Sequence, residues 1–161
     1  MIVPFKPEHL LNIDIQQQES SRFQTERHAE TLAQGYCAFT CLNVDSVPMA
    51  CAGLMPMWPG RAMAWASLSF QVRPYLKAIT RRVLIELDCA PFTRIEMYIR
   101  PGFHQAVRWA TVHLGFKYES TMERGGTDGQ DLWVFVRIND LSSPAVKRLK
   151  HGSDPFYPRR G

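Results

Sequence analysis

The clearest pattern in the chain is a repeated change of hydrophobic spacing in its second half. Apolar residues first recur every three or four positions, which predicts a helix from Pro74 to Ala90. They then alternate with polar residues from Arg94 to Arg100, which predicts a strand, and return to helical spacing from Phe103 to Leu114. A last segment, Leu132 to Ile138, is apolar on both faces and predicts a covered strand. Because only a helical crossover joins parallel strands over so short a stretch, this order predicts a partly parallel sheet.

The first half predicts a short strand, two helices and an antiparallel meander. Met1 to Phe5 is strand-like, and Pro7 suits the first turn of a helix whose apolar side is Leu10, Leu11 and Ile15. Thr25 is predicted to cap a second helix that ends at Gly35. Three further strands are predicted at 36–44, 49–54 and 61–69, with a loop at Pro56–Gly60 before the last one.

Charge divides the chain into a neutral domain and a basic tail. Residues 1–140 carry 14 basic and 14 acidic side chains, so the net charge of +4 belongs to residues 141–161. We therefore expect one domain over residues 1–140, followed by a basic tail that contains proline and serine. The tail's basic residues, with Phe156 and Tyr157 among them, suit a phosphate backbone. A solvated terminus explains them better, so nucleic acid is not the partner that we predict.

The cysteine spacing and the lack of long apolar runs argue against a metal site and a membrane partner. The four cysteines have no CxxC spacing and no accompanying HExxH motif, so we expect core packing in a reducing compartment and no metal site. No apolar run approaches a membrane span or a signal peptide, which favours a cytoplasmic protein without a membrane partner. The loop around Met55–Trp58 is unusually apolar. It either caps the core or forms a lip for a substrate or partner.

Three segments and the order of the elements carry a family resemblance. The segments are MIVPFKPEHLL at 1–11, ITRRVLIEL at 79–87 and AVRWATVHLGF at 106–116. They are similar to the opening strand and helix, the helix after the pyrophosphate loop, and the fourth helix of the GNAT superfamily of N-acetyltransferases. The resemblance covers residues 1 to about 138. It implies an α/β (α+β mixed sheet) fold, with a central mixed sheet of six to seven strands flanked by about four helices.

The resemblance implies that acetyl-CoA is the cofactor. In the family it binds where two parallel strands separate, with its pyrophosphate on backbone N–H groups at a helix N-terminus. The family's Gln/Arg-x-x-Gly-x-Gly/Ala loop corresponds here to Tyr75–Thr80, so that Ala78 and the branched Thr80 stand at the two small positions. Arg73 and Lys77 can supply positive charge from their side chains instead. The implied cofactor-binding residues are Ser69, Gln71, Arg73, Tyr75, Lys77, Ala78, Ile79, Thr80 and His104.

The family's catalytic positions are altered. The tyrosine that protonates the departing thiolate is replaced by Thr111, and the asparagine seven residues before it by His104. A threonine hydroxyl is a poor general acid. The resemblance therefore gives Thr111 and Tyr118 as catalytic candidates, with Tyr98 as a further phenol. For the base, Asp45 and Glu96 are the nearest carboxylates in sequence.

Two functions follow from this resemblance. The first is an acetyl-CoA-dependent N-acetyltransferase that acts on an amine of a protein or small molecule. The second is a catalytically inactive GNAT-fold protein of the virion, or of assembly or host interaction, because the chain also resembles divergent members encoded by tailed bacteriophages. Its partner would be a virion or host protein contacted through the tail and the Met55–Trp58 loop, in the host cytoplasm or the virion.

Overall fold

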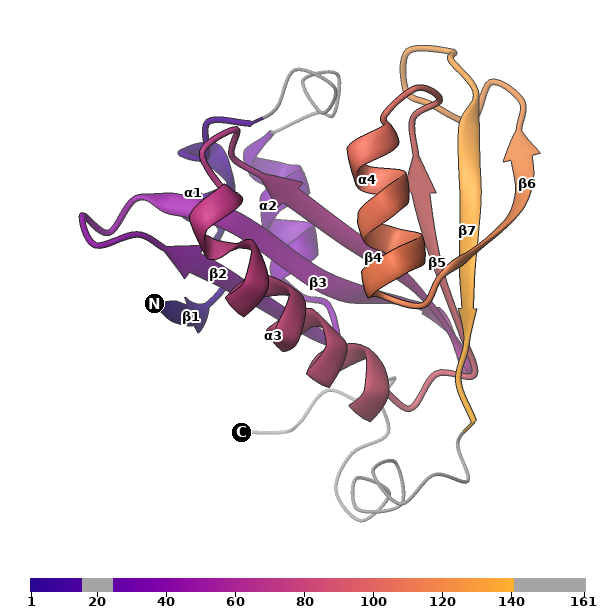
Figure 1. Cartoon of the computed structure of the whole chain (residues 1–161), viewed down its shortest axis with the longest axis horizontal. Helices are drawn as coiled ribbons and strands as arrows, with labels where there is room; N and C mark the ends of the chain where they lie inside the picture. The colour runs from indigo at the N-terminus through magenta and orange to yellow at the C-terminus, as the bar shows by residue number, and fades with distance from the viewer. Residues whose placement is uncertain (16–24, 141–161) are drawn as a thin grey trace.

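The structure is a computed structural model that describes residues 1–15 and 25–140. Within these residues, seven strands form one mixed sheet in the order β1-β2-β3-β4-β5-β7-β6 (Figure 1). This confirms the predicted mixed sheet of six to seven strands. The predicted basic tail, residues 141–161, lies outside the described residues. The strands are β1 (Ile2–Pro4), β2 (Cys37–Leu42), β3 (Pro48–Trp58), β4 (Arg61–Leu68), β5 (Arg94–Ile99), β6 (Lys117–Met122) and β7 (Leu132–Ile138).

Four α-helices flank the sheet in the described ranges, α1 and α2 on one face and α3 and α4 on the other (Figure 1). A 3₁₀ turn at Arg73–Tyr75 leads into α3, and a π-helical turn at Trp109–His113 continues α4. Of the helices that the structure describes, none has both the length and the apolar character needed to cross a membrane. The helices are α1 (Pro7–Leu11), α2 (Glu26–Ala33), α3 (Leu76–Cys89) and α4 (His104–Arg108).

The predicted helix starts are confirmed, but the first helix is shorter than predicted. The Thr25 side chain accepts a hydrogen bond from the His28 N–H at 3.2 Å, as expected of an N-cap. Helix α1 ends at Leu11, which is 41% exposed, so Leu11 and Ile15 do not extend an apolar helix face. Ile15 instead makes an isolated antiparallel bridge with Ser69, just beyond the end of β4.

The predicted loop at Pro56–Gly60 is shorter in the structure, where only Pro59 and Gly60 form a turn. Strand β3 continues to Trp58, and Trp58 pairs with Arg61 across a tight turn in which Gly60 has a φ of +83°. Proline is tolerated at position 56 because the pairing of β3 with β2 reaches only as far as Leu54. The Arg61 guanidinium lies 4.4 Å from the centre of the Trp58 ring, which is half-exposed. Whether this hairpin contacts a partner stays a prediction.

The prediction of one regular helix from Phe103 to Leu114 was only partly right. At Trp109 the helix widens, and the Leu114 N–H bonds to the Trp109 carbonyl at 3.2 Å, five residues back. Trp109 and Ala110 are buried in this wider turn. Periodicity alone does not show such a change, because the apolar residues still fall on one side.

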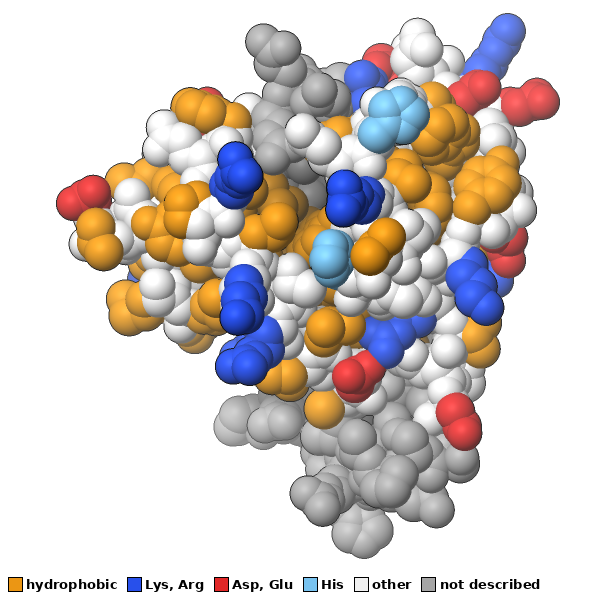
Figure 2. Space-filling model, viewed as in Figure 1, with side chains coloured by type: hydrophobic (Ala, Val, Ile, Leu, Met, Phe, Trp, Pro, Cys, Tyr) orange, Lys and Arg blue, Asp and Glu red, His pale blue; other side chains and the backbone are white. Residues whose placement is uncertain are grey.

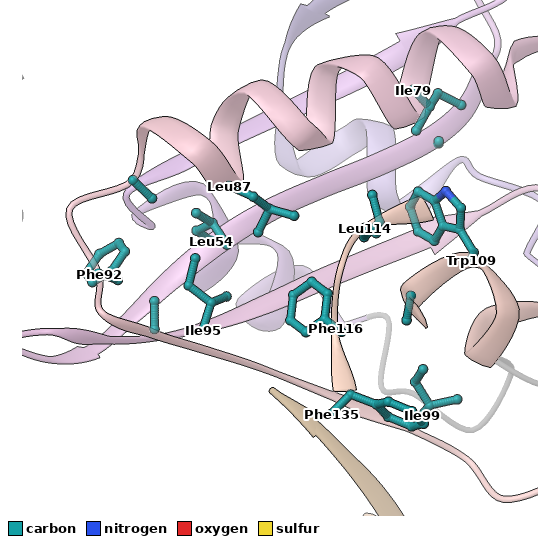
Figure 3. Close-up of a cluster of buried hydrophobic side chains, with 14 of the residues drawn as sticks. Leu54, Ile79, Leu87, Phe92, Ile95, Ile99, Trp109, Leu114, Phe116 and Phe135 are labelled. Atoms are coloured by element: carbon teal, nitrogen blue, oxygen red, sulfur yellow. The ribbon is translucent and has the colours of Figure 1, made fainter. Parts of the chain in front are cut away.

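The main core lies between the sheet and the helices α3 and α4. Leu54, Leu87 and Ile95 meet at its centre, and Phe135 and Ile99 pack together at the β5–β7 end (Figure 3). A second cluster, on the opposite face under α1 and α2, contains Leu10, Ala29, Leu32 and Trp65. Strand β4 therefore sits at the centre of the molecule and is covered on both faces.

Candidate functional site

Strands β4 and β5 are paired at one end and separate at the other. Their parallel ladder covers three residue pairs and ends at Met63 and Glu96, although the strands continue to Leu68 and Ile99 (Figure 1). A cavity of about 370 Å³ occupies the space where they separate. Parallel strands that part in the middle of a sheet leave a gap open to both faces, so a ligand here can contact groups on either side.

The two sides of the cavity differ in chemistry. On the side of α3 and α4 its walls are apolar and come from Ala64, Ala66, Leu68, Met97, Ile99 and Trp109. On the other side it is lined by Trp65, Tyr98 and Arg100. Arg100 forms an ion pair with Asp128 of the β6–β7 connection. The apolar side suits an extended chain with few charges, and the other side suits a polar reactant.

Positive charge lines the approach to the cavity at the start of α3. Lys77 and Arg81 are exposed four residues apart on one side of α3, and exposed Arg73 precedes them in the 3₁₀ turn. Among the described residues, none of the three forms an ion pair with a carboxylate. Figure 2 shows a recess with hydrophobic walls between α3 and α4, with Lys and Arg side chains at its rim. This arrangement suits the phosphate groups of an anionic ligand.

The structure brings together only some of the predicted cofactor-binding residues. Arg73 lines the cavity, and Lys77 and Ala78 are exposed on the first turn of α3. The Ile79 side chain is fully buried in the main core, so only its backbone can face a ligand. Tyr75 is half-buried and also packs on that core.

Ser69 and Gln71 lie in the connection between β4 and the 3₁₀ turn. The Ser69 hydroxyl is buried and accepts a hydrogen bond from the Gln71 N–H at 3.1 Å. Gln71 itself is exposed. Ser69 therefore shapes the backbone of this connection, and neither side chain lines the cavity.

Thr80 does not crowd the cavity, contrary to the concern raised by its branched side chain. Its hydroxyl accepts a hydrogen bond from the Trp109 indole N–H at 2.9 Å and donates one to the Leu76 carbonyl at 2.7 Å. In Figure 3 the indole nitrogen of Trp109 lies on the side of the ring that faces α3. The threonine thus ties α3 to α4 beside the cavity, which explains how it is accommodated where the family has a small residue.

Neither His104 and Thr111, predicted from the family's fourth helix, nor Tyr118 lines the cavity. His104 is exposed at the start of α4, next to Phe103 and Gln105, which do line the cavity. The Thr111 hydroxyl is exposed and donates to the Val107 carbonyl of its own helix at 2.9 Å. Tyr118 is 56% exposed on β6 and its hydroxyl bonds to that of Thr121. The structure therefore does not gather these three residues around the cavity.

A buried carboxylate stands beside the polar side of the cavity. Glu96 is 1% exposed and bonds to Arg61 and to Arg94, each at 2.6 Å. It also accepts a hydrogen bond from the Tyr98 hydroxyl at 2.9 Å. Arg94 continues this network to Glu119 on β6. The network links β4, β5 and β6 on the face of the sheet opposite α3.

The charge state of Glu96 follows from these contacts. Burial alone would raise the pKa of its carboxyl, but hydrogen bonds from Arg61, Arg94 and Tyr98 outweigh burial and lower the pKa to about 2. Burial and the hydrogen bond to Glu96 raise the pKa of Tyr98. Glu96 is therefore a permanent anion that holds the Tyr98 proton, and it is too weak a base to take a proton from an amine at neutral pH.

Several cavity residues were missed in the sequence, among them Phe70, Met97, Gln105 and Trp109. One signal does point to the cavity. Ala62, Ala64 and Ala66 alternate along β4 and face α3, where larger residues would otherwise fill the core. Within the described residues, no group of three or more His, Cys, Asp or Glu side chains is arranged to hold a metal ion.

No protein-family model matches the chain, and no protein of curated function matches it. Solved structures do match. Ard1 from Thermoplasma volcanium superposes with a TM-score of 0.72 at 13% identity, over 87% of this chain and 97% of that one. The ribosomal-protein-S18-alanine N-acetyltransferase of Escherichia coli gives a TM-score of 0.66 at 16% identity, over 86% and 92% of the two chains.

A third match was solved with a ligand. The GNAT superfamily phosphinothricin acetyltransferase of Sinorhizobium meliloti, in complex with AcCoA, gives a TM-score of 0.64 at 14% identity, over 86% of this chain and 87% of that one. The chain has the GNAT fold. At these identities the similarity establishes the fold, and the activity has to be argued from the site itself.

Proposed function

We propose that this protein is an acetyl-CoA-dependent N-acetyltransferase that transfers an acetyl group to an amine of a protein or a small molecule. The observation that carries the proposal is the cavity between the separating strands β4 and β5. The AcCoA complex of the Sinorhizobium meliloti acetyltransferase, which has the same fold, supports the choice of ligand.

The residues around the cavity fit the parts of acetyl-CoA. The exposed side chains of Arg73, Lys77 and Arg81 suit its phosphates, and they replace the glycine-rich loop that the family uses. The apolar wall at Ala64, Ala66 and Leu68 suits the pantetheine and acetyl groups. The amine would then approach from the opposite face, where Tyr98 and Arg100 line the cavity.

When bound, acetyl-CoA supplies an acetyl group activated as a thioester. A C–N bond to the amine forms as the C–S bond breaks. The amine nitrogen loses a proton, and the CoA sulfur gains one. Of the phenols considered from the sequence, Tyr98 lines the cavity and Tyr118 does not. We therefore assign the proton that reaches the sulfur to Tyr98, whose hydroxyl would exchange its 2.9 Å hydrogen bond to Glu96 for one to the sulfur. Thr111 and Tyr118 stay as predictions from the resemblance alone.

The alternative of a non-catalytic virion, assembly or host-interaction protein gains no support from the fold or from the structural matches. Of the two parts expected to carry such contacts, the basic tail lies outside the described residues, and Met55–Trp58 forms the end of β3. This alternative stays a prediction. It differs from an enzyme in a measurable way, because it requires no transfer of an acetyl group.

The proposal is tested by acetyl transfer from isotope-labelled acetyl-CoA. The purified protein is incubated with labelled acetyl-CoA and a panel of amines, namely peptides with free N-termini, lysine peptides and polyamines, and the products are read by mass spectrometry. We expect labelled acetyl on at least one amine class, above a control without protein. Binding of acetyl-CoA without transfer to any amine would contradict the enzyme and favour the non-catalytic alternative.

A pair of tyrosine variants separates the two candidate acids. Loss of a general acid typically slows a reaction by a hundredfold or more. We therefore expect Tyr98→Phe to lower kcat by about a hundredfold while the affinity for acetyl-CoA stays the same. Tyr118→Phe is the matched control and should retain full activity. Full activity of Tyr98→Phe together with loss of activity in Tyr118→Phe would refute the role of Tyr98 and favour Tyr118 as the acid.

A further inference from the structure

A second, smaller cavity adjoins the main one on the α3 side of the sheet. It measures about 30 Å³, and part of its lining is shared with the main cavity. The two spaces therefore meet along one wall. The shared residues are Ala64, Trp65, Ala66, Met97 and Trp109.

The smaller cavity is almost entirely apolar. Its far wall is formed by residues such as Phe39, Ala52 and Leu54 of the meander, and Val83 of α3. The one carboxylate at its edge, Glu86, accepts a hydrogen bond from Arg82 at 2.7 Å, so its charge is compensated outside the space. Apolar cavities of this kind hold water poorly and accept hydrocarbon groups.

The wall between the two cavities includes small and flexible side chains. Ala64 and Ala66 have the smallest side chains that a strand offers apart from glycine. Met97 is unbranched and adapts to its neighbours. These residues follow the last β4–β5 pair, Met63 and Glu96, so the shared wall lies at the closed end of the gap between the two strands.

We propose that the smaller cavity receives the end of an acyl chain longer than acetyl, so that the protein takes propionyl-CoA and butyryl-CoA as acyl donors. This inference rests on the proposed function, because it requires a CoA thioester in the main cavity. A space of 30 Å³ has room for about two groups of the size of a water molecule. Two methylene groups beyond acetyl make a butyryl chain.

The expected effect follows from the burial of methylene groups. Each buried methylene strengthens binding about fourfold, so butyryl-CoA is expected to bind about 15-fold more tightly than acetyl-CoA. Free CoA, which carries no acyl group, provides the baseline. The experiment is a calorimetric titration of the full chain with CoA, acetyl-CoA, propionyl-CoA, butyryl-CoA and hexanoyl-CoA.

Two variants change the smaller cavity without touching the main one. Ala52→Val fills it, because Ala52 is buried and lines only the smaller cavity. We expect this variant to bind butyryl-CoA no more tightly than acetyl-CoA, with acetyl-CoA binding unchanged. Val83→Ala enlarges the cavity and is expected to strengthen the binding of hexanoyl-CoA relative to butyryl-CoA. Thermal unfolding of both variants confirms that they are folded.

The outcomes separate this inference from the proposed function. Equal affinities for all acyl-CoA species, with CoA itself bound, would overturn the acyl pocket and leave the cofactor site intact. The same conclusion follows if Ala52→Val weakens every CoA species alike and Val83→Ala leaves the hexanoyl-CoA to butyryl-CoA ratio unchanged. Failure of CoA and all its thioesters to bind would overturn both proposals.

Discussion

Replacing Glu96 by glutamine tests the buried network beside the cavity. The carboxylate is 1% exposed and is held by Arg61, Arg94 and Tyr98, so Glu96→Gln leaves two arginines facing each other without their shared anion. The carboxyl pKa falls from an ordinary 4.5 to about 2 in the folded protein. At 1.36 kcal/mol for each pKa unit, this corresponds to about 3 kcal/mol of stability, near the cost of breaking a buried ion pair.

The sign of the pH dependence follows from the lowered pKa. A carboxyl that ionises more readily in the folded state stabilises the protein fully above its unfolded pKa and loses that effect as the pH falls toward its folded pKa. For Glu96 the window runs from about pH 5 down to about pH 2. By pH 3, about 2 kcal/mol of the 3 is expected to be gone.

The assay is urea unfolding of wild type and variant at pH 7, 5, 4 and 3. We expect Glu96→Gln to unfold about 3 kcal/mol more easily at pH 7, with the difference shrinking at each lower pH. Glu119→Gln is the matched control. Glu119 contacts Arg94 of the same network but is 44% exposed, so its loss should cost much less than the loss of Glu96. A Glu96→Gln protein as stable as wild type at pH 7, or a difference that does not change with pH, would refute this reasoning.

Two further predictions concern packing around the cavity, and both are read by urea unfolding. In Gly53→Ala the new Cβ would lie 2.4 Å from the Cys37 carbonyl oxygen and 3.0 Å from the Trp65 ring. We therefore expect the free energy of unfolding to fall by about 2 kcal/mol or more. A fall below about 0.5 kcal/mol would contradict the observed contact. For the bond between α3 and α4, a double-mutant cycle of Trp109→Phe and Thr80→Val should give a coupling energy of about 1 kcal/mol, whereas additive effects would show that the 2.9 Å hydrogen bond contributes nothing.

The order of the elements was readable from the sequence because each element carries its own period. The stripe of α3, the alternation of β5 and the two-sided apolar strand β7 all appear within about two residues of their predicted bounds. The element bounds that were predicted wrongly, such as the end of β3, are set by neighbouring strands that are distant in the sequence. Strand β3 can run through Pro56, which has no N–H, because the pairing of β3 with β2 ends at Leu54 and no hydrogen-bond donor is needed beyond it. Local turn chemistry does not reveal where that pairing ends.

The candidate site was less readable than the fold. Glu96 was noted as a carboxylate, and Arg94 lies two residues before it on the same side of β5, but Arg61 meets it only through the parallel register of β4 and β5. Thr80 looked like an obstacle to a phosphate until its hydrogen bond to Trp109, 29 residues away, became visible. Contacts of this range depend on how helices and strands pack, and no local pattern in the sequence encodes them.

The most direct test of the cavity between β4 and β5 is a calorimetric titration of the protein with acetyl-CoA. We expect a dissociation constant in the micromolar range, or about −8 kcal/mol. The double variant Arg73→Gln, Lys77→Gln should weaken binding about tenfold, because it removes two charge-assisted contacts to phosphate. Arg124→Gln, which changes an exposed arginine in the β6–β7 connection, should leave binding unchanged. No heat of binding and no thermal stabilisation at millimolar acetyl-CoA would contradict a cofactor site in this cavity.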